Sequence, residues 1–135
     1  MCYRRYFVPA ARGAEALRAL RALHARLAPL LQVSEVRAVA ADSFWLSPSG
    51  ARDSICLHFT WIGDEAAVRE VLPAVEAALQ PFGARPHWGK LFTMEPAAVA
   101  AQYPQMAEYR QALRQHDPDG KFRNRFVEKY VFSSE

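Results

Sequence analysis

The sequence predicts an α+β fold: an antiparallel or mixed sheet of the split β-α-β (ferredoxin-like) type, with helices on one face, plus a C-terminal helix and tail. Three observations support it. Residues 52–62 alternate apolar and more polar side chains, which is the period of a strand with one apolar face. Residues 14–31 and the segment after Asp64 instead place apolar side chains at helical spacing. The expected elements therefore run strand, helix, strand, strand, helix, strand.

The first two expected elements are a short strand and a long helix. Residues 3–9 are aromatic and β-branched and stop at a proline, as an opening strand does. In residues 14–31 leucines recur on one helical face, while Arg18, Arg21 and Arg26 take other faces. We expect one helix here, with the arginines facing solvent.

Two extended segments follow, at residues 33–46 and 52–62, separated by turn-forming residues at 47–50. They predict an antiparallel hairpin. If its turn centres near Pro48, paired positions have numbers that sum to 95 or 97. An odd sum places odd positions of the first strand on the same face as even positions of the second.

The second half of the chain begins with a helix capped by Asp64 that carries apolar residues as far as Leu79. Pro73 lies inside this helix and should kink or divide it. Residues 83–93 are expected to be extended.

The C-terminal part predicts a helix over roughly residues 104–116 and a tight turn at 117–120. The tail, residues 122–132, is rich in aromatic side chains. We expect it to pack back onto the body of the protein.

Composition excludes several functional classes. With 135 residues, 51% of them hydrophobic, the chain is expected to form a single domain, 1–135. The net charge of +3 arises from scattered residues, so no basic stripe for nucleic acid is expected. Cys2 and Cys56 lack the spacing of a metal site, and neither a metal nor a disulfide is predicted. No apolar run reaches about 20 residues and no secretory signal is evident, so the prediction is cytoplasmic.

The central strands carry one polar cluster. Glu35 and Arg37 share a face of the first strand, and His58 and Thr60 share a face of the second. Under an odd register these four side chains lie together, opposite the apolar core. They form either a solvated sheet face with cross-strand ion pairs or a dense set of donors and acceptors for a polyol. Lys90 could add a cation to this set.

The segment Arg85-Pro86-His87-Trp88-Gly89-Lys90 is the second candidate feature. Its proline restricts the backbone, and its glycine permits close backbone approach. Such a segment is suited to holding Lys90 at a defined point. No glycine-rich phosphate loop and no Gly-x-Ser-x-Gly nucleophile motif occurs, because the six glycines are isolated.

Taken together, these motifs resemble a known family. They are Ser34-Glu35-Val36-Arg37-Ala38-Val39-Ala40-Ala41-Asp42 with Trp45-Leu46-Ser47, His58-Phe59-Thr60-Trp61, Arg85 to Lys90, and Asp117-Pro118-Asp119-Gly120-Lys121-Phe122-Arg123-Asn124. In this order they look like the C-terminal part of alditol oxidases such as xylitol and sorbitol oxidases. These are relatives of D-arabinono-1,4-lactone oxidase among flavoproteins of the vanillyl-alcohol-oxidase type.

The resemblance implies an FAD-dependent oxidase in which this chain forms the cap over the flavin. Glu35 and Arg37 would bind substrate hydroxyls and shape the charge at the reacting carbon, and His58 and Thr60 would hold neighbouring hydroxyls. Lys90 would lie near both flavin and the reacting hydroxyl. Its implied reaction is hydride transfer from a CH–OH group to flavin, with O2 reduced to H2O2.

Within this resemblance, Lys90, Arg37, Glu35 and His58 are the predicted catalytic residues. His87 would either lie at the cofactor or serve a structural role. Trp88 is expected to anchor packing.

The chain departs from the family in one respect: the FAD-binding domain is absent from these residues. We therefore expect a separate FAD-binding domain or subunit as partner, with a polyol or sugar lactone as substrate. The alternatives are a fragment of an aldonolactone oxidase and a non-catalytic orphan cap domain. Self-association into a homo-oligomer is expected through the face that would meet the flavin domain.

Overall fold

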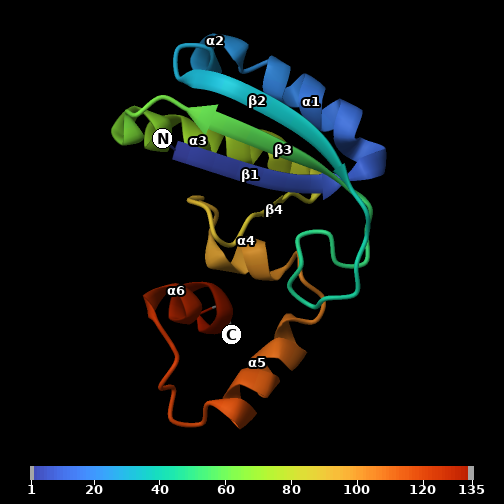
Figure 1. Cartoon of the computed structure of the whole chain (residues 1–135), viewed down its shortest axis with the longest axis vertical. Helices are drawn as coiled ribbons and strands as arrows, with labels where there is room; N and C mark the ends of the chain where they lie inside the picture. The colour runs from blue at the N-terminus through green and yellow to red at the C-terminus, as the bar shows by residue number, and fades with distance from the viewer. Residues whose placement is uncertain (1, 134–135) are drawn as a thin grey trace.

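The computed structural model describes residues 2–133 and contains a four-stranded sheet in the order β2-β3-β1-β4 (Figure 1). All three strand pairs are antiparallel. The strands are β1 (Cys2–Pro9), β2 (Leu31–Val39), β3 (Ser54–Trp61) and β4 (Arg85–Pro86). This order is that of a split β-α-β sheet, so the predicted fold class is confirmed.

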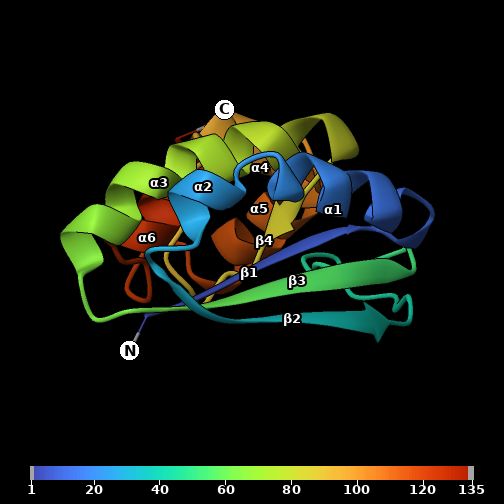
Figure 2. The same ribbon diagram turned by 90° about the horizontal axis from the view of Figure 1, so that it is seen from above.

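Helices cover one face of the sheet, as Figure 2 shows. They are α1 (Gly13–Arg21), α2 (His24–Leu27) and α3 (Glu65–Leu79). Leu57, Phe59 and Trp61 of β3 are buried in the core, as the period of two predicts. The opposite face of β3 carries Cys56, His58 and Thr60. The sheet therefore has one apolar face, which the helices cover, and one face on which polar side chains can gather.

The prediction of one helix over residues 14–31 is wrong, because two shorter helices lie there. A short 3-10 turn (Ala10–Arg12) leads into α1, which ends at Arg21, and α2 ends at Leu27. Between them the Leu23 amide bonds to the Leu20 carbonyl at 2.9 Å, a three-residue step that interrupts the helical ladder. Beyond Leu27, Pro29 has no amide hydrogen to continue the helix, and Leu31 already pairs with Trp61 in the sheet.

Helix α3 begins where predicted, because the Asp64 carboxylate accepts a hydrogen bond from the Ala67 amide at 3.0 Å. Pro73 does not divide it. One polar residue of α3 is buried: Glu76 accepts a hydrogen bond from the Tyr6 hydroxyl at 2.7 Å and another from the Thr93 amide at 2.8 Å. Glu76 thus joins the helix to β1 and to the segment after β4.

The central strands pair with an odd register, as predicted, but not with the predicted sums. Glu35 lies opposite His58 and Arg37 opposite Cys56, so paired numbers sum to 93 from Val33 to Val39. The sums of 95 and 97 are wrong because the strands are shorter than expected and leave residues 40–53 as a long connection. The expected turn at 47–50 exists within it, closed by a hydrogen bond from the Gly50 amide to the Ser47 carbonyl.

The C-terminal part lies beyond β4 (Figure 1). Of the extended segment expected at 83–93, only Arg85–Pro86 is a strand. Three helices and two irregular turns follow α3. They are a 3-10 turn (Gln80–Phe82), α4 (Pro96–Ala100), α5 (Met106–His116), α6 (Arg125–Val127) and a π-helical turn (Glu128–Phe132).

The tail packs back as predicted, since Tyr130 and Val131 are buried in the core. Among residues 2–133, no helix combines the length and the apolar character that crossing a lipid bilayer requires.

Candidate functional site

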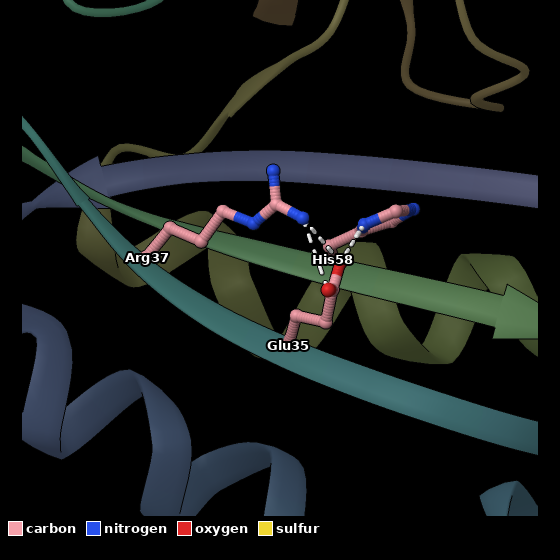
Figure 3. A network of polar contacts seen from close by, with 3 residues as sticks. All are labelled: Glu35, Arg37 and His58. Atoms are coloured by element: carbon pink, nitrogen blue, oxygen red, sulfur yellow. Dashed lines mark hydrogen bonds and ion pairs between the residues drawn. The ribbon is translucent and has the colours of Figure 1, made fainter.

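The polar cluster predicted from the sequence forms on the sheet face opposite α1 and α3. Glu35 on β2 and His58 on β3 are cross-strand neighbours, and Arg37 follows Glu35 on the same face of β2 (Figure 3). The His58 Nδ1 atom lies 2.6 Å from Glu35 Oε2. Arg37 Nη2 donates to the same oxygen at 2.8 Å and to Glu35 Oε1 at 3.0 Å. One carboxylate therefore holds an imidazole and a guanidinium.

The Glu35 carboxylate is kept ionised by these donors. The hydrogen bond from Arg37 is the largest cause that lowers the pKa of Glu35, and the hydrogen bond with His58 is the second. Because an ionised carboxylate can only accept hydrogen bonds, His58 Nδ1 must carry the hydrogen. The orientation of the His58 ring is thereby fixed from the β2 side.

The other nitrogen of His58 is available. The side chain is buried, and its Nε2 atom has no hydrogen-bond partner among residues 2–133. A buried polar atom without a partner is uncommon in folded proteins and calls for an explanation. With Nδ1 donating to Glu35, a neutral His58 presents the Nε2 lone pair as an acceptor of a hydrogen bond or a proton.

Thr60 and Lys90 extend the site towards one end of the sheet. Thr60 lies opposite Tyr3 of β1, and the Tyr3 and His58 rings are 5.7 Å apart. The Lys90 ammonium lies over the Tyr3 ring, 5.2 Å from its centre. Through its contact with the Tyr3 ring, Lys90 lies in the same part of the structure as His58 and Thr60.

His87 stabilises the turn that carries Lys90. Its Nδ1 atom accepts a hydrogen bond from the Gly89 amide at 3.0 Å, and its carbonyl accepts one from the Lys90 amide at 3.0 Å. Burial, followed by the nearby charges of Arg5 and Lys90, lowers the pKa of His87. These contacts favour the structural interpretation of this residue.

Trp88 anchors the same segment, as expected. Its indole nitrogen donates to the Leu46 carbonyl at 2.8 Å, and its ring lies 5.1 Å from the Tyr103 ring.

Sequence reasoning missed two residues of this face, Tyr3 and Arg5. Arg5 lies on β1 directly opposite His58, and its carbonyl accepts a hydrogen bond from the His87 amide at 3.0 Å. The signal was present, because Tyr3 and Arg5 alternate with buried residues of the strand predicted at 3–9. We call the set Tyr3, Arg5, Glu35, Arg37, His58 and Thr60 the polar face.

The polar face offers a buried acceptor, a fixed carboxylate, two arginines and the hydroxyl-bearing side chains of Tyr3 and Thr60, with the Lys90 cation beside it. Such a set suits a neutral ligand with several hydroxyl groups, and its cations suit developing negative charge. No three His, Cys, Asp or Glu side chains of residues 2–133 come together in a way that would hold a metal ion.

The chain is similar to several known proteins. The family model of D-arabinono-1,4-lactone oxidase matches residues 3–130. The chain is 48% identical to alditol oxidase of Streptomyces sp. (strain IKD472 / FERM P-14339) over 122 residues, which are 90% of this chain and 29% of that protein. It is 32% identical to L-gulono-1,4-lactone dehydrogenase of Mycobacterium tuberculosis (strain ATCC 25618 / H37Rv), over 93% of this chain and 29% of that protein.

A third relative is L-gulonolactone oxidase of Mus musculus, 29% identical over 73% of this chain and 23% of that protein. The chain thus spans less than a third of the length of each of these relatives.

Proposed function

The chain belongs to the D-arabinono-1,4-lactone oxidase family, and we propose that its polar face is the substrate-binding half of an FAD-dependent oxidase acting on alditols. The observation that carries the proposal is the buried, unpartnered Nε2 of His58, in a ring held by Glu35 and Arg37. A buried imidazole nitrogen without a partner favours a bound ligand over a merely solvated face.

In this reaction the substrate carbon loses a hydride and its hydroxyl loses a proton. FAD, when bound, supplies the hydride acceptor, and O2 then takes the electrons to give H2O2. His58 is the residue that accepts the proton, at Nε2, and Glu35 stabilises the imidazolium that results. This pairing of a base with an orienting carboxylate is a common arrangement for proton transfer.

The remaining residues orient the substrate and meet its charge. Thr60, two residues from His58 on the same face of β3, binds a neighbouring hydroxyl. Arg37 and Lys90 supply positive charge at either end of the face, where negative charge develops as the hydroxyl loses its proton. Glu35 accepts a hydrogen bond from a substrate hydroxyl at the lone pairs that Arg37 and His58 leave open.

The flavin itself needs a further part of the protein. The fit to these residues is partial: Lys90 and Arg5 could face an electron-rich ring edge, but the isolated glycines offer no loop for a pyrophosphate. We therefore assign the adenine and pyrophosphate contacts to a flavin-carrying domain outside these 135 residues, either in the same gene product or in a second subunit.

Complementation tests the proposal. The purified chain is mixed with the part of Streptomyces alditol oxidase that lies outside the matched residues, loaded with FAD, and xylitol-dependent H2O2 is measured. We expect activity only in the mixture. Lys90→Met should reduce it about 100-fold, because one preorganised charge at a reacting centre has an effect of this order.

The matched control is Lys129→Met, since Lys129 is exposed on the C-terminal turn and away from the polar face. It should keep the activity of the unaltered chain. Folded halves that associate by sedimentation yet never produce H2O2 would contradict the proposal and favour a non-catalytic cap domain.

A lactone oxidase is the second candidate, because two of the relatives are named for L-gulono-1,4-lactone or L-gulonolactone. Glu35 disfavours anionic sugar acids but not a neutral lactone. The ratio of activities with xylitol and with L-gulono-1,4-lactone in the complemented enzyme decides between them. The higher identity to alditol oxidase leads us to expect the ratio to favour xylitol.

A further inference from the structure

Glu76 is a buried acid that the proposed reaction does not use. It lies on α3, on the helix-covered side of the sheet, and is 7% exposed. Its Oε1 atom accepts hydrogen bonds from the Tyr6 hydroxyl at 2.7 Å and the Thr93 amide at 2.8 Å, and its Oε2 atom accepts one from the Thr93 hydroxyl at 2.5 Å. A carboxylate costs free energy to bury, and an apolar side chain fills a core position without that cost. These bonds therefore call for a role beyond packing.

All three hydrogen bonds are donated to Glu76. Burial, followed by the charge of Glu76, raises the pKa of Tyr6, so its hydroxyl keeps the hydrogen that it donates. The Thr93 amide can only donate, and the Thr93 hydroxyl can turn to do the same. Because Tyr6 belongs to β1 and Thr93 follows β4, Glu76 fixes the distance between β1 and the segment after β4.

That segment, residues 87–93, contains neither helix nor strand, and Lys90 lies at its centre. Its first residue is tied to β1, because the His87 amide donates to the Arg5 carbonyl at 3.0 Å. Its last residue, Thr93, is tied to α3 by the two bonds to Glu76. The backbone that carries the cation is thus held on both sides of Lys90.

The contact at the tip of the Lys90 side chain is too weak to fix the cation by itself. The ammonium lies over the Tyr3 ring, 5.2 Å from its centre, and Tyr3 is 36% exposed. A cation–π contact at an exposed site contributes little, and the lysine side chain is long and flexible. Tyr3 and Tyr6 both belong to β1. The bridge from Tyr6 through Glu76 therefore places the backbone near Lys90 relative to the strand that carries the Tyr3 ring.

We propose that Glu76 is a positioning residue for Lys90, acting through its two hydrogen bonds to Thr93. The inference rests on the proposed function, in which Lys90 supplies positive charge where the substrate hydroxyl loses its proton. Displacement of a reacting group by about 1 Å can reduce a rate about 100-fold. A carboxylate in the core, on the far side of the sheet from the polar face, can therefore control the reaction without touching the substrate.

Proton NMR of the chain alone tests the placement, without flavin or substrate. The ε-methylene protons of Lys90 adjoin the ammonium that lies over the face of the Tyr3 ring. The ring current should shift them upfield from those of Lys121, which is exposed. Tyr3→Leu should abolish this shift and so identify its source. Glu76→Leu should also abolish it, because Thr93 loses both bonds and the segment is released.

Three further variants separate hydrogen bonding from packing. Glu76→Gln should keep the shift, since its amide oxygen accepts from Tyr6 and from the Thr93 amide, and its amide nitrogen donates to the Thr93 hydroxyl. Val75→Ala removes part of a fully buried neighbour on α3, and should lower stability yet keep the shift. Thr93→Val removes the hydroxyl bond alone and should reduce the shift. It decides the question if Glu76→Leu does not fold.

Kinetics in the complemented mixture test the consequence for the reaction. Glu76→Leu should lower kcat for xylitol about 10- to 100-fold and change KM less than about threefold, because Lys90 acts on charge that develops during the reaction. In a chain that already carries Lys90→Met, the same change should lower kcat less than about threefold, since residues that act as a unit have non-additive effects. An unlinked structural defect would give the same factor in both backgrounds.

The inference is overturned if folded Glu76→Leu or Thr93→Val keeps the full Lys90 shift, if Val75→Ala loses it equally, or if the unaltered chain shows none. Equal losses of kcat with and without Lys90→Met also overturn it. An unaltered mixture that makes no H2O2 counts against the proposed function instead, and the NMR measurement then still decides whether Glu76 places Lys90.

Discussion

Glu35 is the residue on which the candidate site depends, because one carboxylate orients two functional side chains. Arg37 and His58 approach the same oxygen, Oε2, at 2.8 Å and 2.6 Å. Loss of Glu35 would free the His58 ring to rotate and leave the adjacent arginine unpaired. Glu35 is a positioning residue, and it affects proton transfer through His58.

Glu35→Gln should alter the dependence of stability on pH. The hydrogen bond from Arg37, followed by that with His58, lowers the pKa of Glu35 in the folded protein. A lowered pKa stabilises the fold fully above the unfolded value of about 4.3, and this contribution is lost as the pH falls through the folded pKa. The melting temperature of the unaltered chain should therefore fall more between pH 7 and pH 3 than that of the variant.

Glu70→Gln is the control, because Glu70 is exposed on α3. Its melting temperature should follow that of the unaltered chain across the same range. Parallel curves for Glu35→Gln and the unaltered chain would show that the ion pair contributes nothing in solution.

At the scale of elements, Arg85 is one of the side chains that hold the connection at residues 40–53 in place. Arg85 of β4 donates from Nη1 to the Gly50 carbonyl at 2.9 Å and from Nε to the Gln102 carbonyl at 2.9 Å. Its guanidinium also lies over the Tyr103 ring, 4.9 Å from the centre. A buried guanidinium that satisfies several carbonyls ties the loop, β4 and the segment after α4 together.

Arg85→Met should lower the free energy of unfolding by about 2–3 kcal/mol, since charged hydrogen bonds are lost and buried carbonyls are left without donors. Arg85→Lys should not restore it, because an ammonium cannot reproduce the planar fork. Urea denaturation measures the loss, and amide exchange at residues 44–50 should rise more than exchange in β3. Arg26→Met, on the exposed side of α2, serves as control; an equal loss there would refute the assigned role.

Elements with a strong local pattern could be predicted from the sequence. The alternation at residues 52–62 and the Asp64 cap each fix a structure through nearby residues alone, and both are confirmed. The break at Leu23 could not be predicted, because neither glycine nor proline marks it. Nor could the register sum, which depends on how much chain the connection at 40–53 takes up.

The candidate site was predictable in part for the same reason. Glu35 and His58 were placed together because parity alone decides the face of a strand. The alternation in residues 3–9 indicates the face on which Arg5 lies, but its place opposite His58 depends on the pairing of β1 with β3, which no local pattern reveals. Glu76 looks in sequence like one polar position in a helix, and only the fold brings Tyr6 and Thr93 to it.

At the scale of the whole molecule, aromatic rings join the sheet to the C-terminal helices. Phe92, which follows β4, lies 4.8 Å from the Tyr130 ring and 6.2 Å from the Phe126 ring. Trp88 contacts the same group, with its ring 6.2 Å from that of Phe126. Since Trp88 is two residues from Lys90, the packing of the tail bears on where that cation lies.

Phe92→Ala should therefore lower the free energy of unfolding by about 3–5 kcal/mol, as expected for a ring deleted from a core. Phe92 is 6% exposed, whereas Phe122 in the same C-terminal part is 80% exposed, so Phe122→Ala is a matched control that should cost under about 0.5 kcal/mol. Amide exchange should rise in α6 and the π-helical turn before it rises in β3, because the cluster is their link to the sheet. Equal losses for the two variants, or exchange that rises uniformly, would show that the C-terminal part does not depend on this cluster.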